Sequence, residues 1–387
     1  MTRPRGGDVH PLIFAALGTL VFLNVYAPQS LLPLLSREFR VGPAQVGTVV
    51  GATMLAMALA SPLTGVLADA WGRRRTVLWA YALLILPALL AAAAPTLEVL
   101  NAARFVQGLL IPGVMVALNA YIAEEVSPAG RSRALTAYVT GTVLGGFLGR
   151  FLSGLVAAQG EWQVAFWLLA VACTAGWIVA RLALPTERAF EPRRDLAAVL
   201  AGVRDHLRNP ALLATCAVGF LILFMLVGTF NTLTLRLSDP PYGLTTAQTG
   251  SVFAVYLLGV VITPLAGPLL GARGPRTALL AAVGASIAGL LLTYSTPLPL
   301  VIAGVAAAAC GVFLAQSAAL AAVQRSVSSA RSLAGGLYHL SYYGGGAAAS
   351  VVAGYAFEAG GWGATVPLLV VSLLLASLVG ALGWRYS

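Results

Sequence analysis

Two arginines lie within the long apolar segments of this chain, where each could bind a negatively charged or polar group. Arg104 and Arg150 are each about 7 residues from a segment end, or roughly 10 Å deep at the helical rise of 1.5 Å per residue. An arginine at this depth either faces a cavity or reaches back to the surface with its long side chain. Two at one level could attract an anion, or could bind carbonyl groups left free at a helix bend.

One histidine also lies within an apolar segment. His339 belongs to the polar patch Tyr338–Tyr343, and histidine changes charge near neutral pH. It could carry a proton, or it could pack through hydrogen bonds. The 13 acids, by contrast, lie in loops or near segment ends, so the embedded charge is positive.

The composition places these segments in a membrane. The chain has 387 residues, 59% of them hydrophobic and 9% charged, whereas a soluble domain has about 25% charged residues. The net charge of +10 does not indicate nucleic-acid binding, because the arginines sit in short loops between apolar segments. No metal-ligand cluster, nucleophile–base pair or nucleotide-binding loop is present in the sequence. We therefore expect no metal, no cofactor and no enzymatic activity.

Twelve apolar stretches are long enough for a membrane-spanning helix, which needs about 20 residues. The sequence therefore predicts an all-α membrane protein. The first six spans are expected near Pro11–Leu35, Ala44–Thr64, Val77–Ala94, Leu97–Ile122, Ala134–Ala157 and Gln163–Leu184. The second six are expected near Ala211–Leu235, Thr246–Leu270, Ala278–Tyr294, Leu298–Val323, Leu333–Phe357 and Ala364–Trp384.

The arginines set the expected orientation. With both termini inside, eighteen arginines fall on the cytoplasmic side and three fall outside. Positive charge concentrates in cytoplasmic loops. We therefore expect an inner-membrane protein with both termini in the cytoplasm.

The chain also repeats. Ser61–Gly65 recurs as Thr263–Gly267, and an offset of 200 residues pairs Gly145 with Gly345. We expect two pseudo-symmetric six-helix bundles, residues 1–184 and 211–387. A cytoplasmic linker, 185–210, joins them. Apolar residues at helical spacing in this linker predict a short amphipathic helix on the membrane surface, the alternative being a flexible tether: Leu196, Val199, Leu200, Val203 and Leu207.

The turn between the second and third spans carries the most specific motif. It reads Gly65-Val66-Leu67-Ala68-Asp69-Ala70-Trp71-Gly72-Arg73-Arg74-Arg75-Thr76. This sequence resembles the signature loop between helices 2 and 3 of the major facilitator superfamily, although an alanine stands at position 70 where the family has a base. The resemblance implies the major facilitator fold of twelve helices in two bundles.

The resemblance also implies a gate at this turn. In the family the acid, here Asp69, faces the start of the eleventh helix, where the helix dipole favours an anion. Here that start lies near Ser329–Ser332. The arginines would pair with acids at the inner end of the fourth helix, here Glu124 or Glu125. The alternative is a turn that only sets orientation. The expected gating residues are Gly65, Asp69, Gly72, Arg73, Arg74 and Glu124.

Two further segments resemble family signatures. Leu100–Gly108 resembles the signature of the fourth helix, in which the position of Arg104 is assigned to proton or substrate coupling. Gly141–Arg150 resembles the antiporter signature of the fifth helix, although Gly146 replaces its proline and Arg150 its last glycine. Glycines let neighbouring helices approach closely. We expect three of them to pack the two halves together: Gly141, Gly145 and Gly149.

In the resembled fold the first, fourth, seventh and tenth helices line a central cavity. Polar residues on these helices and in the segments described above are candidates for substrate binding or coupling. Each could instead join helices by hydrogen bonds. The candidates are Asn24, Tyr26, Arg104, Gln107, Asn119, Arg150, Asn231, Gln316, His339 and Tyr342.

The overall pattern is most similar to the arabinose-efflux-permease-like and drug-efflux branch. It implies a secondary active transporter working by alternating access, with proton-coupled efflux of a drug or sugar as the leading expectation. The embedded carboxylate of many proton-coupled members is absent, so an anion carrier or uniporter that uses the buried arginines is an alternative. A non-transporting membrane sensor on the same fold is another. We expect a monomer whose partners are the lipid bilayer, a small-molecule substrate and protons.

Overall fold

In a computed structural model, the described residues (9–159, 161–187, 203–327 and 331–384) form helices and no strand. This confirms the predicted all-α membrane protein. The first half contains α1 (Pro11–Tyr26), η1 (Ala27–Leu31), α2 (Leu32–Phe39), α3 (Pro43–Trp71), α4 (Arg73–Ala92), α5 (Leu97–Glu125), α6 (Pro128–Ala157) and α7 (Gln163–Ala183). The second half contains α9 (Pro210–Ser238), α10 (Thr246–Val252), η2 (Phe253–Leu257), α11 (Leu258–Leu292), α12 (Leu298–Ser326) and α13 (Arg331–Gly383).

Within the described residues, 11 helical stretches are long and apolar enough to cross a membrane. The longest of them, Leu333–Gly383, is interrupted where Gly360 and Gly361 leave helical geometry. This break falls between the eleventh and twelfth predicted spans. Dividing the stretch there gives the predicted number of twelve.

Glycines with positive φ form the tight corners at equivalent places in the two halves. Gly72 separates α3 from α4 with φ of 99°, and Gly274 breaks α11 with φ of 74°. Residues with a Cβ rarely adopt this conformation, so glycine is needed at both corners. The two positions also correspond in the sequence repeat of the signature turn.

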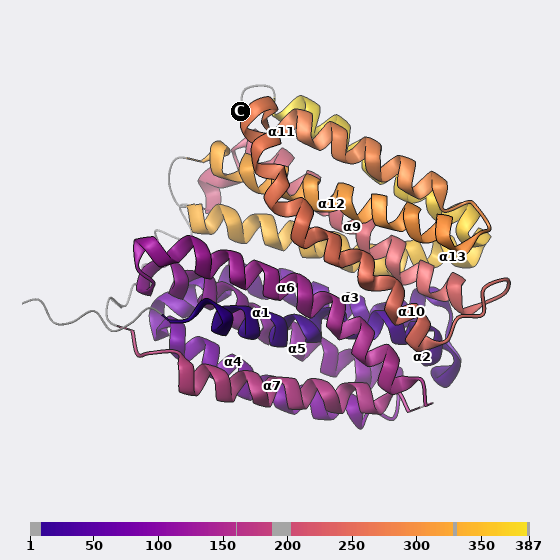
Figure 1. The fold of residues 1–387 in the computed structure, drawn as a ribbon, viewed down its shortest axis with the longest axis horizontal. Coiled ribbons are helices and arrows are strands. Elements are labelled where there is room, and N and C mark those ends of the chain that lie inside the picture. Colours follow the sequence, from indigo (N-terminus) through magenta and orange to yellow (C-terminus); the bar gives the residue numbers. More distant parts are fainter. Residues whose placement is uncertain (1–8, 160, 188–202, 328–330, 385–387) are drawn as a thin grey trace, which may run out of the picture.

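The helices of the two halves lie on opposite sides of the molecule (Figure 1). Within the first half, α1 packs on α6 and α3 packs on α5. Within the second half, α9 packs on α13 and α11 packs on α12. Contacts between the halves run mainly from α3 to α13 and from α6 to α10.

The outer surface of the bundle is apolar. Large side chains such as Leu63, Trp79 and Leu182 are 60–80% exposed. Such a surface can face lipid. The side chains are apolar, and the backbone groups of a helix are hydrogen-bonded within the helix, so they need no water.

We call the end of the bundle that carries the Asp69–Arg75 turn the arginine end, and the other the opposite end. The described chain starts and finishes at the arginine end (Figure 1). Most of the predicted linker helix lies outside the described residues, and residues 203–206 of its described part are helical.

Candidate functional site

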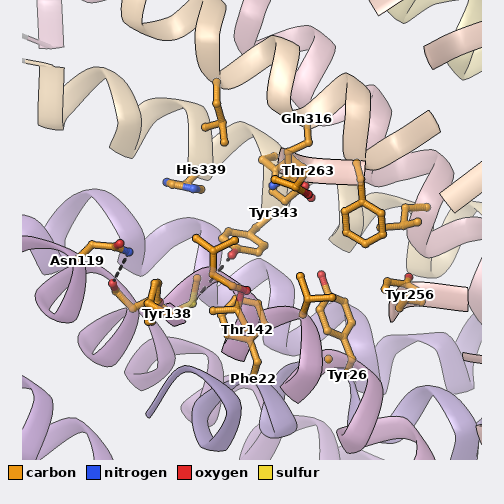
Figure 2. A pocket seen from close by; sticks show the side chains of 18 of the residues that line it. Phe22, Tyr26, Asn119, Tyr138, Thr142, Tyr256, Thr263, Gln316, His339 and Tyr343 are labelled. Atoms are coloured by element: carbon orange, nitrogen blue, oxygen red, sulfur yellow. Dashed lines mark hydrogen bonds between the residues drawn. The ribbon is translucent and has the colours of Figure 1, made fainter. Parts of the chain in front are cut away.

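A cavity of about 360 Å³ lies between the two halves. Figure 2 shows Asn119, Tyr138 and Thr142 of the first half facing His339 and Gln316 of the second half across it. The wall is largely aromatic and aliphatic, with scattered amide, hydroxyl and imidazole groups. Among the described residues that line it, none is an acid and Arg150 is the one arginine. A mainly apolar pocket with a few polar groups is the usual form of a small-molecule site.

The structure brings six of the ten predicted substrate or coupling residues to this cavity: Tyr26, Asn119, Arg150, Gln316, His339 and Tyr342. Two of them contact each other, because the Tyr342 hydroxyl donates to Oε1 of Gln316 at 3.0 Å. The His339 ring stacks on Tyr343, with ring centroids 6.0 Å apart.

The other four predicted residues, Asn24, Arg104, Gln107 and Asn231, lie outside the described cavity lining. Asn24 is buried, and its side chain donates to the Leu20 carbonyl at 3.2 Å. Gln107 is also buried, and it accepts a hydrogen bond from Arg104. Both hydrogen bonds stay within one helix, the first in α1 and the second in α5.

Arg150 forms the cavity wall toward the opposite end. The side chain is completely buried, and its Nε donates to Oε1 of Gln29 at 2.6 Å. Its Nη1 donates to the Gly146 carbonyl, also at 2.6 Å. The guanidinium carbon lies 4.1 Å from the ring centroid of Tyr26 and 4.0 Å from that of Tyr256. Cation–π contact with these rings replaces part of the lost hydration of the charge.

A hydrogen bond closes the opposite end of the cavity across the two halves. Gln29 of η1 donates from Nε2 to Oδ1 of Asn231 on α9 at 2.7 Å, and both side chains are buried. Nearby, the Ala44 amide of α3 donates to Glu358 of α13 at 2.9 Å. Because Gln29 also binds Arg150, the cavity wall and the contact between the halves belong to one polar network.

Arg104 makes a different set of contacts from Arg150. It too is completely buried, and its three groups Nε, Nη1 and Nη2 donate to the Val49 carbonyl, Gln107 and the Val25 carbonyl. Val25 lies next to the point where α1 gives way to η1, so its carbonyl needs a donor from elsewhere. This arrangement matches the predicted alternative of an arginine bound to carbonyl groups at a helix bend.

The signature turn forms an ion cluster at the arginine end. Arg73 lies 2.8 Å from Asp69 and 2.9 Å from Glu124, so the predicted pairing with an acid at the end of α5 is present. The Arg73 side chain is 10% exposed, whereas the two acids are 46% and 41% exposed. The expected partner of Asp69 is the start of the eleventh predicted helix, near residue 329. Part of that segment lies outside the described residues. The gating role stays a prediction.

Glu187, which the sequence analysis did not predict as a site residue, connects the same turn to the segment after α7. The Glu187 carboxylate accepts from the backbone amides of Arg73 and Arg74 at the start of α4. An acid there satisfies free amides and interacts favourably with the helix dipole. Arg74 in turn donates to the carbonyls of Leu184 at 2.6 Å and Arg181 at 3.1 Å. The sequence signal that could have revealed this contact is an acid, Glu187, shortly after the end of α7, whose last turn contains Arg181.

The three predicted packing glycines contact α1, which belongs to their own half. A Cβ on Gly141 would lie 2.8 Å from the carbonyl carbon of Ala15 and closer still to its oxygen. One on Gly145 would lie 2.9 Å from the carbonyl carbon of Thr19 and closer still to its oxygen. One on Gly149 would meet Leu23 at 2.7 Å. The prediction that they pack the two halves together is therefore wrong. Contact between the halves occurs further along α6, where a Cβ on Gly154 would meet Thr246.

Several aromatic residues of the cavity were also missed. Tyr138 and Tyr256 lie on segments that the family resemblance did not assign to the lining. The described lining draws on α6, η2 and α13 as well as on α1, α5 and α12, and α9 contributes one residue, Leu226. In an apolar span an aromatic residue looks the same whether it faces lipid, core or cavity, so the sequence held no clear signal.

Comparison with known proteins places the fold in one family. The profile of the Major Facilitator Superfamily matches residues 14–247. The inner membrane transport protein YnfM of Escherichia coli is 32% identical over 369 residues, which cover 95% of this chain and 88% of that protein. The uncharacterized MFS-type transporter YybF of Bacillus subtilis is 28% identical over 262 residues, 67% of this chain. That match spans 65% of the length of YybF.

The crystal structure of a point mutant of the nucleoside transporter NupG superposes on 96% of this chain and 100% of its own, with a TM-score of 0.78 and 14% identity. This likeness supports the fold alone. Together with twelve apolar helical segments and the signature turn, the matches show that this chain is a multi-pass membrane protein of the major facilitator superfamily of secondary transporters.

Proposed function

We propose that the chain moves a small organic solute across the inner membrane by alternating access, with the central cavity as its substrate site. The observation that carries this proposal is a cavity with walls from both halves, fastened at one end by the bond between Gln29 and Asn231. Rocking of residues 1–184 against 211–387 would break that bond and open the cavity to the other side.

The distribution of the arginines supports an orientation with the arginine end and both termini in the cytoplasm, because positive charge concentrates in cytoplasmic loops. The cavity wall reaches Asn119 and His339 toward this end. In this orientation the structure is a state whose periplasmic side is closed. The cluster of Asp69, Arg73 and Glu124 would then form part of the cytoplasmic gate.

Alternating access can be tested without knowing the substrate. Thr142 lines the cavity, and in a chain without its natural cysteines we would introduce Thr142→Cys and add a membrane-impermeant maleimide to either face of vesicles. A transporter is labelled from both faces. Adding Asn231→Ala should speed labelling from the periplasmic face roughly two- to twelvefold, which corresponds to one hydrogen bond of about 0.5–1.5 kcal/mol.

Thr234→Val provides the matched control. Thr234 lies three residues from Asn231 on α9, and its hydroxyl donates at 2.7 Å to the Asn231 carbonyl of the same helix. Removing it should leave both labelling rates unchanged. Labelling from the cytoplasmic face alone, in every variant, would contradict transport and favour the sensor.

We favour efflux as the direction of transport and proton exchange as its driving force. His339 supports the coupling to protons. Histidine is the residue type in the described cavity lining that, when unperturbed by its surroundings, changes charge between about pH 5 and 8. If its protonation drives the conformational change, the ratio of periplasmic to cytoplasmic labelling should change at least about threefold between pH 5.5 and 8. The ratio cancels the pH dependence of the thiol itself.

His339→Gln keeps a polar side chain of similar size and removes the titration. The labelling ratio of this variant should be flat over the same pH range. A ratio that depends on pH equally in both chains would assign the effect to another group. A flat ratio in the parent chain would remove proton coupling and leave a uniporter or anion carrier.

A further inference from the structure

Arg150 has one nitrogen without a hydrogen-bond partner, although the side chain is completely buried. Its Nε and Nη1 are occupied by Gln29 and the Gly146 carbonyl, and Nη2 has no acceptor among the described residues. A guanidinium that only held helices together would direct its donors at carbonyls or amides, as Arg104 does with all three of its donating groups.

A second unpartnered polar atom belongs to a residue in contact with Arg150. The hydroxyl of Tyr256 is buried without a hydrogen-bond partner among the described residues, and its ring lies against the guanidinium. Both residues line the cavity, so a cationic N–H and a hydroxyl, each without a partner among the described residues, belong to the wall of its closed end. Most buried polar groups are hydrogen-bonded, so each unpaired one calls for an explanation, and at a cavity wall a bound ligand supplies one.

The remaining wall suits a flat apolar molecule. Phe22 and Tyr26 of α1, Met115 of α5, Phe313 of α12 and Tyr343 of α13 all line the cavity. A cavity of about 360 Å³ is of the size that takes one or two aromatic rings. The described lining lacks an acid, so a cationic solute would find no counter-charge there.

We propose that the closed end of the cavity binds the carboxylate of an aromatic monocarboxylic acid, with Arg150 as counter-charge and the Tyr256 hydroxyl as second donor. The inference rests on the proposed function, because it takes the cavity as the substrate site. The rings of Tyr26 and Tyr256 cover the guanidinium, so one ring moves aside when the carboxylate arrives. The aromatic body of the acid then lies against the aromatic lining of the cavity, which includes Phe22 and Phe313.

This binding mode also connects the ligand to the closed end. A carboxylate that binds side-on, with one oxygen on Nη2 and the other on Nε of Arg150, would displace Gln29 from Nε, and Gln29 holds the bond to Asn231 across the halves. Ligand binding would therefore weaken the contact that keeps the periplasmic side closed. A solute gains differential affinity for the open state in this way, as a transport cycle requires.

Thermal unfolding of the purified full-length protein in detergent tests the proposal with defined probes. Benzoate, 2-naphthoate and indole-3-acetate would each be compared with the neutral amide of the same acid. We expect at least one acid to raise the unfolding temperature by several degrees at millimolar concentration, while its amide gives no shift. Arg150→Gln should weaken binding of that acid at least tenfold, to the affinity of the amide.

Two further variants keep the test valid if Arg150→Gln does not fold. Tyr256→Phe keeps the ring and removes the hydroxyl. It should weaken binding of the acid several-fold and leave binding of the amide unchanged. Arg37→Gln removes an exposed arginine at the opposite end and should retain the full shift. Equal responses to acid and amide, no response to any acid, or an unchanged affinity in Arg150→Gln and Tyr256→Phe would each overturn the proposal.

The two proposals fail separately. Binding of the acid through Arg150 without maleimide labelling from the periplasmic face would leave the anion site intact and remove transport. Labelling from both faces without an acid-specific shift would leave transport intact and remove the substrate class.

Discussion

Gly145→Val should destabilise the protein more than any other single change considered for the first half. A Cβ at this position would lie 2.9 Å from the Thr19 backbone carbon and 2.9 Å from the Phe22 Cβ, and closer still to the Thr19 carbonyl oxygen. Backbone atoms of α1 cannot rotate out of the way, so the two helices must separate. Overpacking costs about 1–3 kcal/mol and sometimes more. We expect a loss of about 3 kcal/mol or more in the free energy of unfolding.

The loss would be measured as a fall in the thermal unfolding temperature in detergent, together with the yield of monodisperse protein. Gly284→Val is the matched control, because Gly284 is an exposed helical glycine of α11 with no atom within 4 Å of the added Cβ. That change should stay within about 0.5 kcal/mol, as surface substitutions do. Equal effects of the two substitutions would show that helix propensity, and not the approach of α6 to α1, decides stability.

The second large effect is expected for Arg104→Ala. The substitution removes three hydrogen bonds, leaves the Val25 carbonyl and the Gln107 side chain without this donor, and opens a cavity where a long side chain was buried. A buried polar group left unpaired costs about 1–3 kcal/mol, and a new cavity adds to this cost. Relief from burying the guanidinium charge offsets part of the loss. We expect a net loss of about 2–4 kcal/mol.

Arg104→Lys should recover less than half of this loss, because an ammonium group cannot reproduce the planar fork that reaches two backbone carbonyls and an amide. Arg37→Ala controls for the loss of one positive charge. Arg37 is 69% exposed and lies 3.9 Å from Asp239, so its removal should cost less than about 1 kcal/mol. Thermal unfolding of the four proteins gives the comparison. An Arg104→Ala protein as stable as the parent would show that the arginine does not hold the bend between α1 and η1.

The two buried arginines illustrate what the sequence could and could not predict. Both lie at similar depth in apolar spans, and the sequence left an anion site and a tie to carbonyl groups as equal alternatives. In the structure, Arg104 contacts the carbonyl groups beside the break in α1, whereas Arg150 reaches the cavity with one nitrogen free. The difference depends on which helices lie alongside α5 and α6, and no local pattern encodes that.

The packing glycines give the same lesson. The spacing of Gly141, Gly145 and Gly149 correctly indicated a helix face that another backbone approaches closely, and the wrong partner was assigned to it. A small-residue face can accept any helix with a suitable opposite surface. The missed Glu187 belongs here too, because its contact with the start of α4 joins segments more than 100 residues apart.

The sequence by itself determined the membrane-spanning helices and the signature turn, because hydrophobic length and closely spaced glycines and charges act locally along the chain. The family resemblance implied that an arginine of the turn pairs with Glu124 or Glu125, and the structure selected Arg73 and Glu124, which are 51 residues apart. Tertiary structure alone decided which polar and aromatic side chains meet in the cavity, and which arginine has a donor left for a ligand. The physical reason is that periodicity fixes the face a residue occupies on its helix, whereas the neighbours of that face are set by how all the helices pack together.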